Sequence, residues 1–585
     1  MSNLEWIKKM TKRIVVASLL LSLVLTGIGT KEEANAAERQ PINLVFVHGS
    51  KQMTLNGKAI QMTTPLPVVK GVTMIPIRTI ANSVGASVYN DSKGTHIDTY
   101  FNKVTLNLNM RGANRNGSYL LLPNAATRIN GTMHVPLSAV KLLWNANYVY
   151  NAELKQISIT IQPEPNVAPI AKFTAPLVVK QGENIIYEDL SYDPDGKIIK
   201  TNWTGRKSTY FEPGVYSVTL SVYDNEGLSS ETVAQDIIVT DEIMYTPYEY
   251  YLRYGNPGDK FELDGKLMNT FKEVDTIESK SGRTLYMSNA PERFFGEGLL
   301  YEDTLNDPSR LFLHHRNGSE NRLKLAVVVT NKGTESVTLT VGNRGLAGPS
   351  VSALQFGSAA VARYFAVSQP RELVIEPGMS INLMPEMEKI IMNPDEGFSG
   401  LIDVDMDGEL TFSTMALQEY TDPVSAVFLL PQLEKVGNRG KFFDTDQYIE
   451  VNEKVGVTES KLRLGQRGPA MAGVDALTGG MTINGGEYGA VTTIKLKNVA
   501  YGTRIILNPR AGVFQGAVTV NGKVVSVPSG GHVKVGEGAL LYTQLQPEGA
   551  AGQQKAPEVT IQYTSPGASS LPILFVFLPA SDFPS

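Results

Sequence analysis

Short runs of alternating apolar and polar residues, separated by turn residues, recur through most of this 585-residue chain. Ser217 to Val222 and Val491 to Leu496 are two examples. A period of two places the apolar side chains on one face of a strand and the polar ones on the other. Helical periodicity is scarce, and the chain is rich in Gly (53) and Pro (32), which supply turns. We therefore expect a mainly β protein.

The composition excludes several classes of protein. The chain has no cysteine, which excludes disulfides, zinc–thiolate sites, iron–sulfur clusters and a cysteine nucleophile. The formal net charge is -5, so the sequence gives no basic surface for nucleic acid. A hydrophobic fraction of 42% with 19% charged residues is typical of globular domains, and the length predicts about four of them.

Residues 1–36 have the parts of a secretory signal peptide. The apolar run from Ile14 to Gly29 is shorter than the ~20 residues that a membrane-spanning helix needs. Ala34 to Ala36 forms the expected cleavage site, so Ala37 begins the mature chain. We expect a secreted protein, extracellular or associated with the cell wall, that does not contact the membrane after cleavage. The basic residues before the run are Lys8, Lys9, Lys12 and Arg13.

Residues 41–161 contain two similar segments, which begin at Met74 to Arg78 (MIPIR) and at His134 to Ser138 (HVPLS). In each segment we expect a short strand, a helix of about ten residues and further strands, hence a small duplicated α+β domain. The repeated pattern resembles the copper amine oxidase-like N-terminal domain, a family common in exported proteins of Gram-positive, spore-forming bacteria. The resemblance implies a stalk-like domain without the copper site or the quinone cofactor of amine oxidases.

Residues 167–240 follow a Pro-rich linker and have strands every 8 to 12 residues, which favours an immunoglobulin-like sandwich. Three markers are Asp193-Pro194-Asp195-Gly196, Trp203 and Pro213-Gly214-Val215-Tyr216. Together they resemble the PKD domain. That family usually has Phe-Gly-Asp-Gly after the Trp, whereas this chain has Thr204 to Lys207 (TGRK).

Residues 241–585 resemble no family, but their alternating runs predict one or two further β-sandwich domains. The simplest division gives residues 241–435 and 436–585. Ile402 to Leu417 is predicted to form a hairpin whose tip is Asp407-Gly408. The apolar segment from Leu571 to Leu578 is predicted to be a last buried strand.

Copper is not expected, and neither is any other cofactor. Amine oxidases use three His ligands, two of them in a His-x-His pair, and this chain has no such pair. His314 and His315 are adjacent, and neighbours on a strand point to opposite faces, so they cannot easily share one ion. The six histidines are His48, His96, His134, His314, His315 and His532.

Calcium is the more plausible metal, and two acidic motifs are candidates. The run from Asp403 to Gly408 has the carboxylate spacing that begins a calcium loop, but its twelfth position is Thr414 instead of Glu. A hairpin tip explains this run better, and Asp193-Pro194-Asp195-Gly196 is mainly a turn. The five calcium candidates are Asp193, Asp195, Asp403, Asp405 and Asp407.

No catalytic residue is assigned. The chain has neither Gly-x-Ser-x-Gly nor His-Glu-x-x-His. An acidic stretch lies beside aromatic residues, as in a glycosidase or a carbohydrate-binding face, but a solvated loop rim is the simpler interpretation. Its members are Glu292, Glu297, Glu302 and Asp303, beside Phe294, Phe295 and Tyr301.

Three hypotheses for function follow. The leading one is an exported structural or adhesive protein of the cell surface without catalysis. The second is a protein that binds cell-wall or extracellular polysaccharide, and the third is a hydrolase with its site in residues 241–585. The expected partner is a polysaccharide or another surface protein. Two inward-facing carboxylates about 5 to 10 Å apart would favour the hydrolase.

Overall fold

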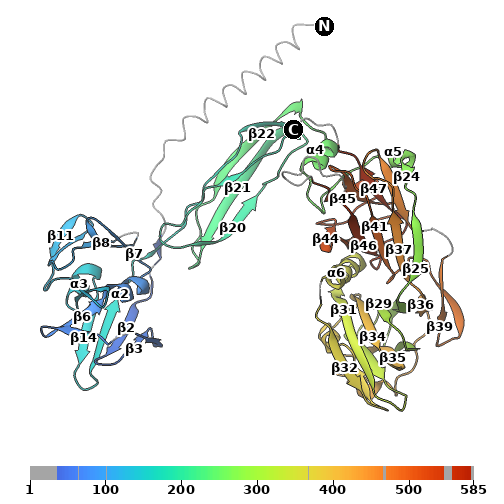
Figure 1. The fold of residues 1–585 in the computed structure, drawn as a ribbon, viewed down its shortest axis with the longest axis horizontal. Helices are drawn as coiled ribbons and strands as arrows, with labels where there is room; N and C mark the ends of the chain where they lie inside the picture. The colour runs from blue at the N-terminus through green and yellow to red at the C-terminus, as the bar shows by residue number, and fades with distance from the viewer. Residues whose placement is uncertain are drawn as a thin grey trace, which may run out of the picture. The chain divides into compact units, whose positions relative to one another are not determined.

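The computed structural model describes residues 36–37, 39–62, 65–99, 102–290, 292–366, 368–465, 470–545 and 557–580 (Figure 1). The fold is mainly β with several sheets, which confirms the predicted class. The chain forms two compact units, residues 1–243 and 244–585. The predicted signal peptide lies outside the described residues except for Ala36. Among the residues described, we find no helix with the length and apolarity needed to cross a bilayer.

The first domain has the symmetry that the duplicated sequence predicts. Each repeat contributes a three-stranded meander to one five-stranded sheet and a hairpin to the other. In the central sheet β6 and β13 pair antiparallel, with Ile75 opposite Val135, which are equivalent residues of the two repeats. One outer sheet has, in order, β11 (Ser118–Leu121), β10 (Gly112–Arg115), β9 (Lys103–Leu106), β8 (Gly94–Asp98) and β7 (Ser87–Asp91). The other outer sheet has β14 (Asn147–Asn151), β15 (Gln156–Ile161), β2 (Ile42–Val47), β3 (Gln52–Leu55) and β4 (Lys58–Gln61). The central sheet has β12 (Thr127–Ile129), β13 (Thr132–Pro136), β6 (Val72–Pro76) and β5 (Val68–Val69).

The two helices of this domain are shorter than the ten residues predicted. They are α2 (Ile77–Ser83) and α3 (Ala139–Trp144). Asn145 ends α3 in the left-handed conformation at φ 53°, and Gly85 has φ 69° just after α2. A left-handed residue at this position stops a helix, because the next amide can no longer continue the helical hydrogen bonds.

The second domain of this unit is a small sandwich. A four-stranded sheet has the order β18 (Val178–Gln181), β22 (Val233–Ile243), β21 (Gly214–Asp224) and β20 (Ile198–Thr204), and β17 (Phe173–Thr174) pairs with β19 (Glu188–Asp189). Trp203 packs edge-on against Phe173 at 4.8 Å between ring centroids. Arg206, in the segment that departs from the PKD pattern, lies over the Trp203 ring at 4.7 Å. Ahead of this domain, β1 (Ala36–Ala37) pairs with β16 (Asn166–Val167).

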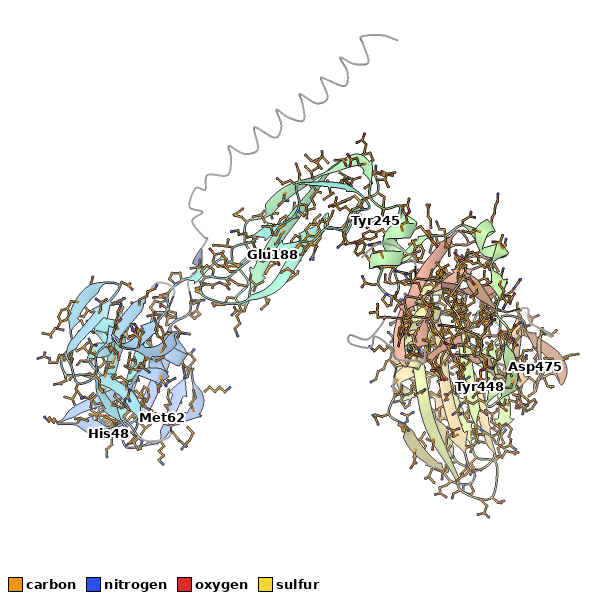
Figure 2. All side chains as sticks on the ribbon, turned by 45° about the horizontal axis from the view of Figure 1, so that its top comes forward. His48, Met62, Glu188, Tyr245, Tyr448 and Asp475 are labelled. Carbon is orange, nitrogen blue, oxygen red and sulfur yellow. The ribbon has the colours of Figure 1, made fainter. Side chains whose placement is uncertain are left out.

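Residues 244–580 form two β-sandwiches, which we call sandwich A and sandwich B. Side chains from facing sheets fill each interior (Figure 2). Sandwich A packs a nine-stranded sheet on a four-stranded one. The larger sheet has β32 (Arg371–Ile375), β31 (Val337–Ser350), β34 (Gly397–Met406), β29 (Ser309–Asn317), β26 (Thr284–Asn289), β36 (Asn438–Phe442), β39 (Met471–Asp475) and β40 (Gly480–Asn484), with β27 (Arg293–Phe294) beside β29; the smaller has β28 (Gly298–Leu305), β35 (Leu410–Gln418), β30 (Leu323–Thr330) and β33 (Ser380–Asn382).

Sandwich B packs two six-stranded sheets. One has β23 (Lys260–Glu262), β45 (Glu537–Thr543), β42 (Arg504–Pro509), β47 (Ile573–Leu578), β38 (Ser460–Leu464) and β24 (Lys272–Glu273); the other has β25 (Ile277–Ser281), β37 (Asp446–Val451), β41 (Val491–Leu496), β46 (Val559–Thr564), β43 (Gly516–Val520) and β44 (Lys523–Val527). The strand predicted near the end of the chain is β47, and all six of its residues are buried. Shorter elements flank the sandwiches: α4 (Pro247–Tyr254), α5 (Gly265–Thr270), α7 (Pro423–Ala426) and the 3-10 turn Pro385–Lys389.

The chain passes between the two sandwiches more than once. Strands β23 to β25 come before sandwich A in the sequence, yet they pair with strands of sandwich B. The chain returns to sandwich B between Phe442 and Asp446, and β39 and β40 then extend the sheet of sandwich A. Strand pairing in both sandwiches thus joins segments that are distant in sequence. The division predicted at residue 435 stays a prediction.

The predicted hairpin at Ile402 to Leu417 is wrong. Both strands exist, but β34 belongs to the nine-stranded sheet and β35 to the four-stranded sheet, so they do not pair with each other. A two-residue hairpin of the common type needs positive φ at both central residues, and neither Asp407 nor Gly408 has it. The turn instead carries the chain across the core from one sheet to the other.

Helix α6 (Ala353–Phe365) fills the space between the two sandwiches. It packs on β31 and β34 of sandwich A and on β43 of sandwich B. Phe312, Phe356 and Leu401 share an apolar cluster there with Val491 and Ala517 of sandwich B. We call this layer the junction, and both candidate polar sites described below lie in it.

Candidate functional site

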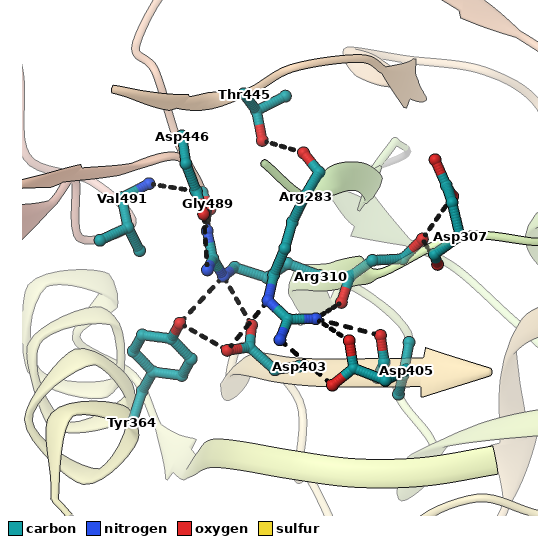
Figure 3. A network of polar contacts seen from close by, with 12 residues as sticks. Arg283, Asp307, Arg310, Tyr364, Asp403, Asp405, Thr445, Asp446, Gly489 and Val491 are labelled. Carbon is teal, nitrogen blue, oxygen red and sulfur yellow. Dashed lines mark hydrogen bonds and ion pairs between the residues drawn. The ribbon is translucent and has the colours of Figure 1, made fainter. Parts of the chain in front are cut away.

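Arg310 on β29 is a buried cation in the junction whose three guanidinium nitrogens all have partners (Figure 3). Its Nε donates to Asp403 at 2.7 Å and to the Tyr364 hydroxyl at 3.0 Å. Its Nη1 donates to Asp446 at 2.5 Å and to the Gly489 carbonyl at 3.1 Å, and its Nη2 donates to Asp446. Burial alone would lower the pKa of Arg310, but Tyr364, Asp403 and Asp446 outweigh burial and raise it.

Arg283, on the loop before β26, pairs with the acidic side chains of β34 (Figure 3). Its Nη1 donates to Asp405 at 2.9 Å, and its Nε lies 3.5 Å from Asp403. Asp403 and Asp405 are two residues apart and therefore share a face of the strand, where two free carboxylates would repel each other. Arginine neutralises both of them, so their spacing is explained without calcium.

The other calcium candidates have different surroundings. Asp407 accepts the backbone N–H of Thr338 at 2.8 Å. Asp195 lies 3.1 Å from the Arg39 guanidinium, while burial raises the pKa of Asp195 more than Arg39 lowers it. Asp193 accepts the Asp195 N–H at 3.2 Å with one oxygen, and its Oδ2 is buried without a hydrogen-bond partner. Of these three residues, Asp193 is the one with a buried carboxylate oxygen that lacks a partner.

A search of the described residues finds no group of three or more His, Cys, Asp or Glu placed to hold a metal ion. The five calcium candidates therefore remain predictions, and so does the absence of copper. The structure does confirm that His314 and His315 point to opposite faces. His315 bonds Ser288 at 2.9 Å and lies near Phe294, whereas His314 lies against Phe312 and Phe356.

The acidic stretch that could have served a hydrolase is largely engaged in contacts within the fold. Glu297 accepts the Gln418 N–H and the Thr421 hydroxyl. Glu302 accepts the Ser413 hydroxyl at 2.7 Å and lies 3.5 Å from the ammonium of Lys332. Asp303 is buried and accepts hydrogen bonds from Tyr301 and Lys441. Of the aromatic side chains, Phe294 and Tyr301 are in the core, and Phe295 is 70% exposed.

A cavity of about 150 Å³ lies in the junction beside His314. Sandwich A contributes Asn289, Glu292, Phe312 and His314 to its lining, and sandwich B contributes Tyr488 and the Gly567–Ala568 loop. The His314 side chain is 4% exposed, and its Nδ1 has no hydrogen-bond partner. The Oδ1 of Asn289 is also buried without a partner. Two of the residues that line the cavity therefore each carry an unpaired polar atom.

The cavity is uncharged on the His314 side and acidic on the Glu292 side. Burial, followed by the neighbouring His315, lowers the pKa of His314 to about 3, so the imidazole is neutral at physiological pH. Burial, followed by the charge of Glu292, raises the pKa of the Tyr488 phenol. The Tyr488 hydroxyl donates to the Ser569 carbonyl at 3.0 Å and so holds the Gly567–Ala568 loop in place. The polar groups of the lining therefore include a neutral imidazole, the Asn289 amide and the Glu292 carboxylate.

The first domain has a larger cavity of about 340 Å³. Its lining is mostly apolar, with Met53, Leu55 and Met62, and includes the polar residues Arg78 and His134. In the second repeat Ser138 takes the place of Arg78, and in the first repeat Met74 takes the place of His134. The polar lining is therefore not repeated in the two halves of the domain.

Comparisons with known proteins match only parts of this chain. The family model for the copper amine oxidase N-terminal domain matches residues 29–99, which confirms that resemblance for this part. A microbial collagenase of Vibrio alginolyticus is 36% identical over 103 residues, which is 16% of this chain and 12% of the collagenase. The chain thus spans about an eighth of that relative.

Similar solved structures have low scores. One of them comes from a study of the promiscuous specificity of carbohydrate-binding modules from the β-sandwich superfamily. It is 18% identical in sequence, the match covers 44% of this chain and 99% of that chain, and the TM-score is 0.13. The M60 catalytic domain with two CBM51 domains from Clostridium perfringens ZmpB has 10% identity over 89% of this chain and 54% of that one, with a TM-score of 0.12. Scores this low carry no argument about fold or function.

Sequence reasoning did not find the cavity beside His314. Its lining comes from residues 289 to 568, and the defining property is that two polar atoms lack partners. A sequence shows which groups can form hydrogen bonds but not which of them are left unpaired. The signal in the sequence is the His314-His315 pair, because two neighbouring residues on a strand point to opposite faces.

Proposed function

We propose that this chain is an exported, non-catalytic adhesive protein of the cell surface, and that residues 241–585 bind a polysaccharide of the cell wall or the extracellular matrix. The observation that carries the proposal is a contrast between carboxylates that are hydrogen-bonded within the fold and polar atoms that have no partner. Glu297, Glu302 and Asp303 are committed to contacts within the fold. Asn289 and His314 instead line a cavity, and each carries a polar atom without a partner, which suits binding.

The first unit acts as a spacer in this proposal. Residues 41–161, with the copper amine oxidase-like pattern, form a stalk-like domain, and residues 167–240 form a PKD-like sandwich. The Asp193 oxygen without a partner supports a calcium ion at Asp193 and Asp195 that would stiffen this spacer. Asp403, Asp405 and Asp407 are weaker calcium candidates, because none of the three has a buried carboxylate oxygen that lacks a hydrogen-bond partner.

The test is retention of the mature chain, residues 37–585, on insoluble cell wall and on a panel of insoluble polysaccharides, with and without calcium. We expect retention by at least one polymer and no release of soluble sugar from it. Release of reducing sugar that grows with time would replace the proposal with the hydrolase hypothesis. No retention on any polymer would overturn polysaccharide binding and favour a protein partner on the cell surface.

A further inference from the structure

We propose that the cavity beside His314 binds the end of one neutral sugar unit through its hydroxyl groups. The inference rests on the proposed polysaccharide binding and assigns it to a site. The cavity lies between the two sandwiches. In sandwich A its lining comes from β26, from the segment after β26 and from β29, and in sandwich B it comes from two loops.

Unpaired buried polar atoms on two of the lining residues support a ligand site in this cavity. A buried polar atom without a hydrogen bond costs roughly 1–3 kcal/mol, so folded proteins retain few of them. Both His314 and Asn289 carry such an atom, and both line the same cavity. Arg439, which is also fully buried, leaves one nitrogen unpaired, but it bonds Asp475 and the Leu300 carbonyl through the others.

Packing holds the His314 ring in one place. The ring stacks on Phe312, with centroids 6.1 Å apart and planes at 7°, and touches Phe356 of α6 at 4.9 Å between centroids. Gly567 also lies close to the ring, and an added Cβ there would come within 2.3 Å of the Nδ1 atom of His314. Any larger residue at position 567 would therefore push the loop away from the imidazole. A site held this rigidly binds without first having to order its side chains.

The lining selects the chemistry of the ligand. Neutral His314 has one ring nitrogen that accepts and one that donates, the Oδ1 of Asn289 accepts, and Glu292 is a carboxylate. Among the described residues that line the cavity, none is cationic. Hydroxyl groups can donate to these acceptors, whereas phosphate or carboxylate would meet Glu292 without a compensating charge.

The size of the cavity limits the ligand to part of one sugar. Sites for drug-sized molecules measure roughly 300–1,000 Å³, and one water occupies about 30 Å³ of liquid. The volume of about 150 Å³ thus holds about five waters or one hydroxyl-bearing edge of a sugar ring. An extended polymer would place only a chain end or a side branch here.

Saturation-transfer NMR on the mature chain tests this site, with glucose, galactose and mannose as neutral probes and glucuronate as the anionic probe. We expect transfer to at least one neutral hexose and none to glucuronate. Two variants should weaken hexose binding by about tenfold or more, which corresponds to the loss of one or two hydrogen bonds. His314→Leu removes the ring nitrogens, and Gly567→Ala displaces the loop.

Gly530→Ala is the matched control, because an added Cβ there meets nothing within 4 Å. It should bind hexose like the wild type. Absence of transfer to every neutral hexose, or unchanged binding in both cavity variants, would overturn the site. If those variants are still retained on the polymer, the proposed function stands and the binding face lies elsewhere. If the wild type is retained on no polymer, the proposed function itself fails.

Discussion

Two buried polar side chains on β29, Arg310 and His314, face the same junction four residues apart, yet their surroundings differ. Every guanidinium nitrogen of Arg310 has a partner, and two carboxylates balance its charge. His314 is equally buried, but its Nδ1 has no partner and its ring lies beside a cavity. Residues four apart on a strand share a face, so the difference lies in the partners that the rest of the chain brings to each.

The comparison separates a polar group that holds the fold from one that is kept for a ligand. Arg310 joins β34, α6, β37 and the Gly489 loop, so it fastens the two sandwiches together. The Nδ1 of His314 makes no hydrogen bond within the protein. A buried polar atom without a partner lowers the stability of the fold. Substitution should therefore have opposite consequences for stability at the two positions.

The largest expected effect is that of Arg310→Met. The variant leaves the partly buried Asp446 without its cation and leaves the buried Asp403 with Arg283 alone, at 3.5 Å, which should lower the free energy of unfolding by about 3–5 kcal/mol. Urea denaturation of the mature chain, followed through the transition of the 244–585 unit, measures the change. Arg316→Met on the same strand is the control, because Arg316 donates only to carbonyl groups and should cost about 1 kcal/mol. Equal losses in the two variants would contradict the role given to Arg310.

The next effect is a dependence on pH that comes from His314. Its pKa is about 3 in the folded protein and near 6.5 when unfolded, so the unfolded state binds the proton first as pH falls. Stability should drop by about 1.4 kcal/mol per pH unit below about 6.5, hence by about 2 kcal/mol between pH 6.5 and 5. The charged or titratable groups around the ring are His315, Glu292 and Tyr488.

His314→Leu should remove this part of the pH dependence. The buried His134 of the other unit has a lowered pKa as well, so the difference between variant and wild type is the quantity to measure. Urea denaturation at pH 7.5, 6.5, 5.5 and 5 supplies it. The same slope in variant and wild type would mean that the ring is protonated, or exposed to water, in the folded protein.

A smaller effect should distinguish an unpaired carboxylate from a paired one. If Asp193 holds calcium with its free oxygen, calcium at about five times Kd should stabilise the 1–243 unit by about 1 kcal/mol. Asp193→Asn should abolish the shift, whereas Asp405→Asn should leave it unchanged. A calcium shift that survives in Asp193→Asn would remove Asp193 from the list of candidates. Scanning calorimetry with calcium or with a chelator measures these shifts.

The smallest effect should be the loss of stability in Asp405→Asn itself. Asp405 pairs with Arg283, but its side chain is 44% exposed, so water screens the pair. Pairs of this kind contribute about 0–1 kcal/mol. A loss as large as that of Arg310→Met would mean that Asp405 belongs to the buried network, and urea denaturation decides between the two.

The sequence predicted the fold class because alternation and turn residues act locally. It also predicted the duplicated first domain, whose repeats meet at Ile75 and Val135. It failed at Asp407-Gly408, where the same residues suit a hairpin or a crossing between sheets, and the backbone angles decide. The pairing of β23 to β25 with sandwich B depends on partners more than 160 residues away, which no local pattern encodes.

The candidate site was harder to predict than the fold. The spacing of Asp403 and Asp405 suggested a metal, but the cations that answer them, Arg283 and Arg310, lie about a hundred residues earlier. In the sequence, His314 differs from the other histidines only in standing next to His315. Its distinguishing property is an unsatisfied nitrogen, and this depends on the absence of a partner from every other part of the junction.

The most direct test of this account is the stability of His314→Leu at pH 7.5, measured beside its hexose binding. Removing an unpaired buried polar atom should leave the free energy of unfolding unchanged or raise it by up to about 1 kcal/mol, while hexose binding is lost. A loss of more than about 1 kcal/mol in stability would show that His314 holds the fold as Arg310 does. That result would contradict the assignment of the cavity as a binding site.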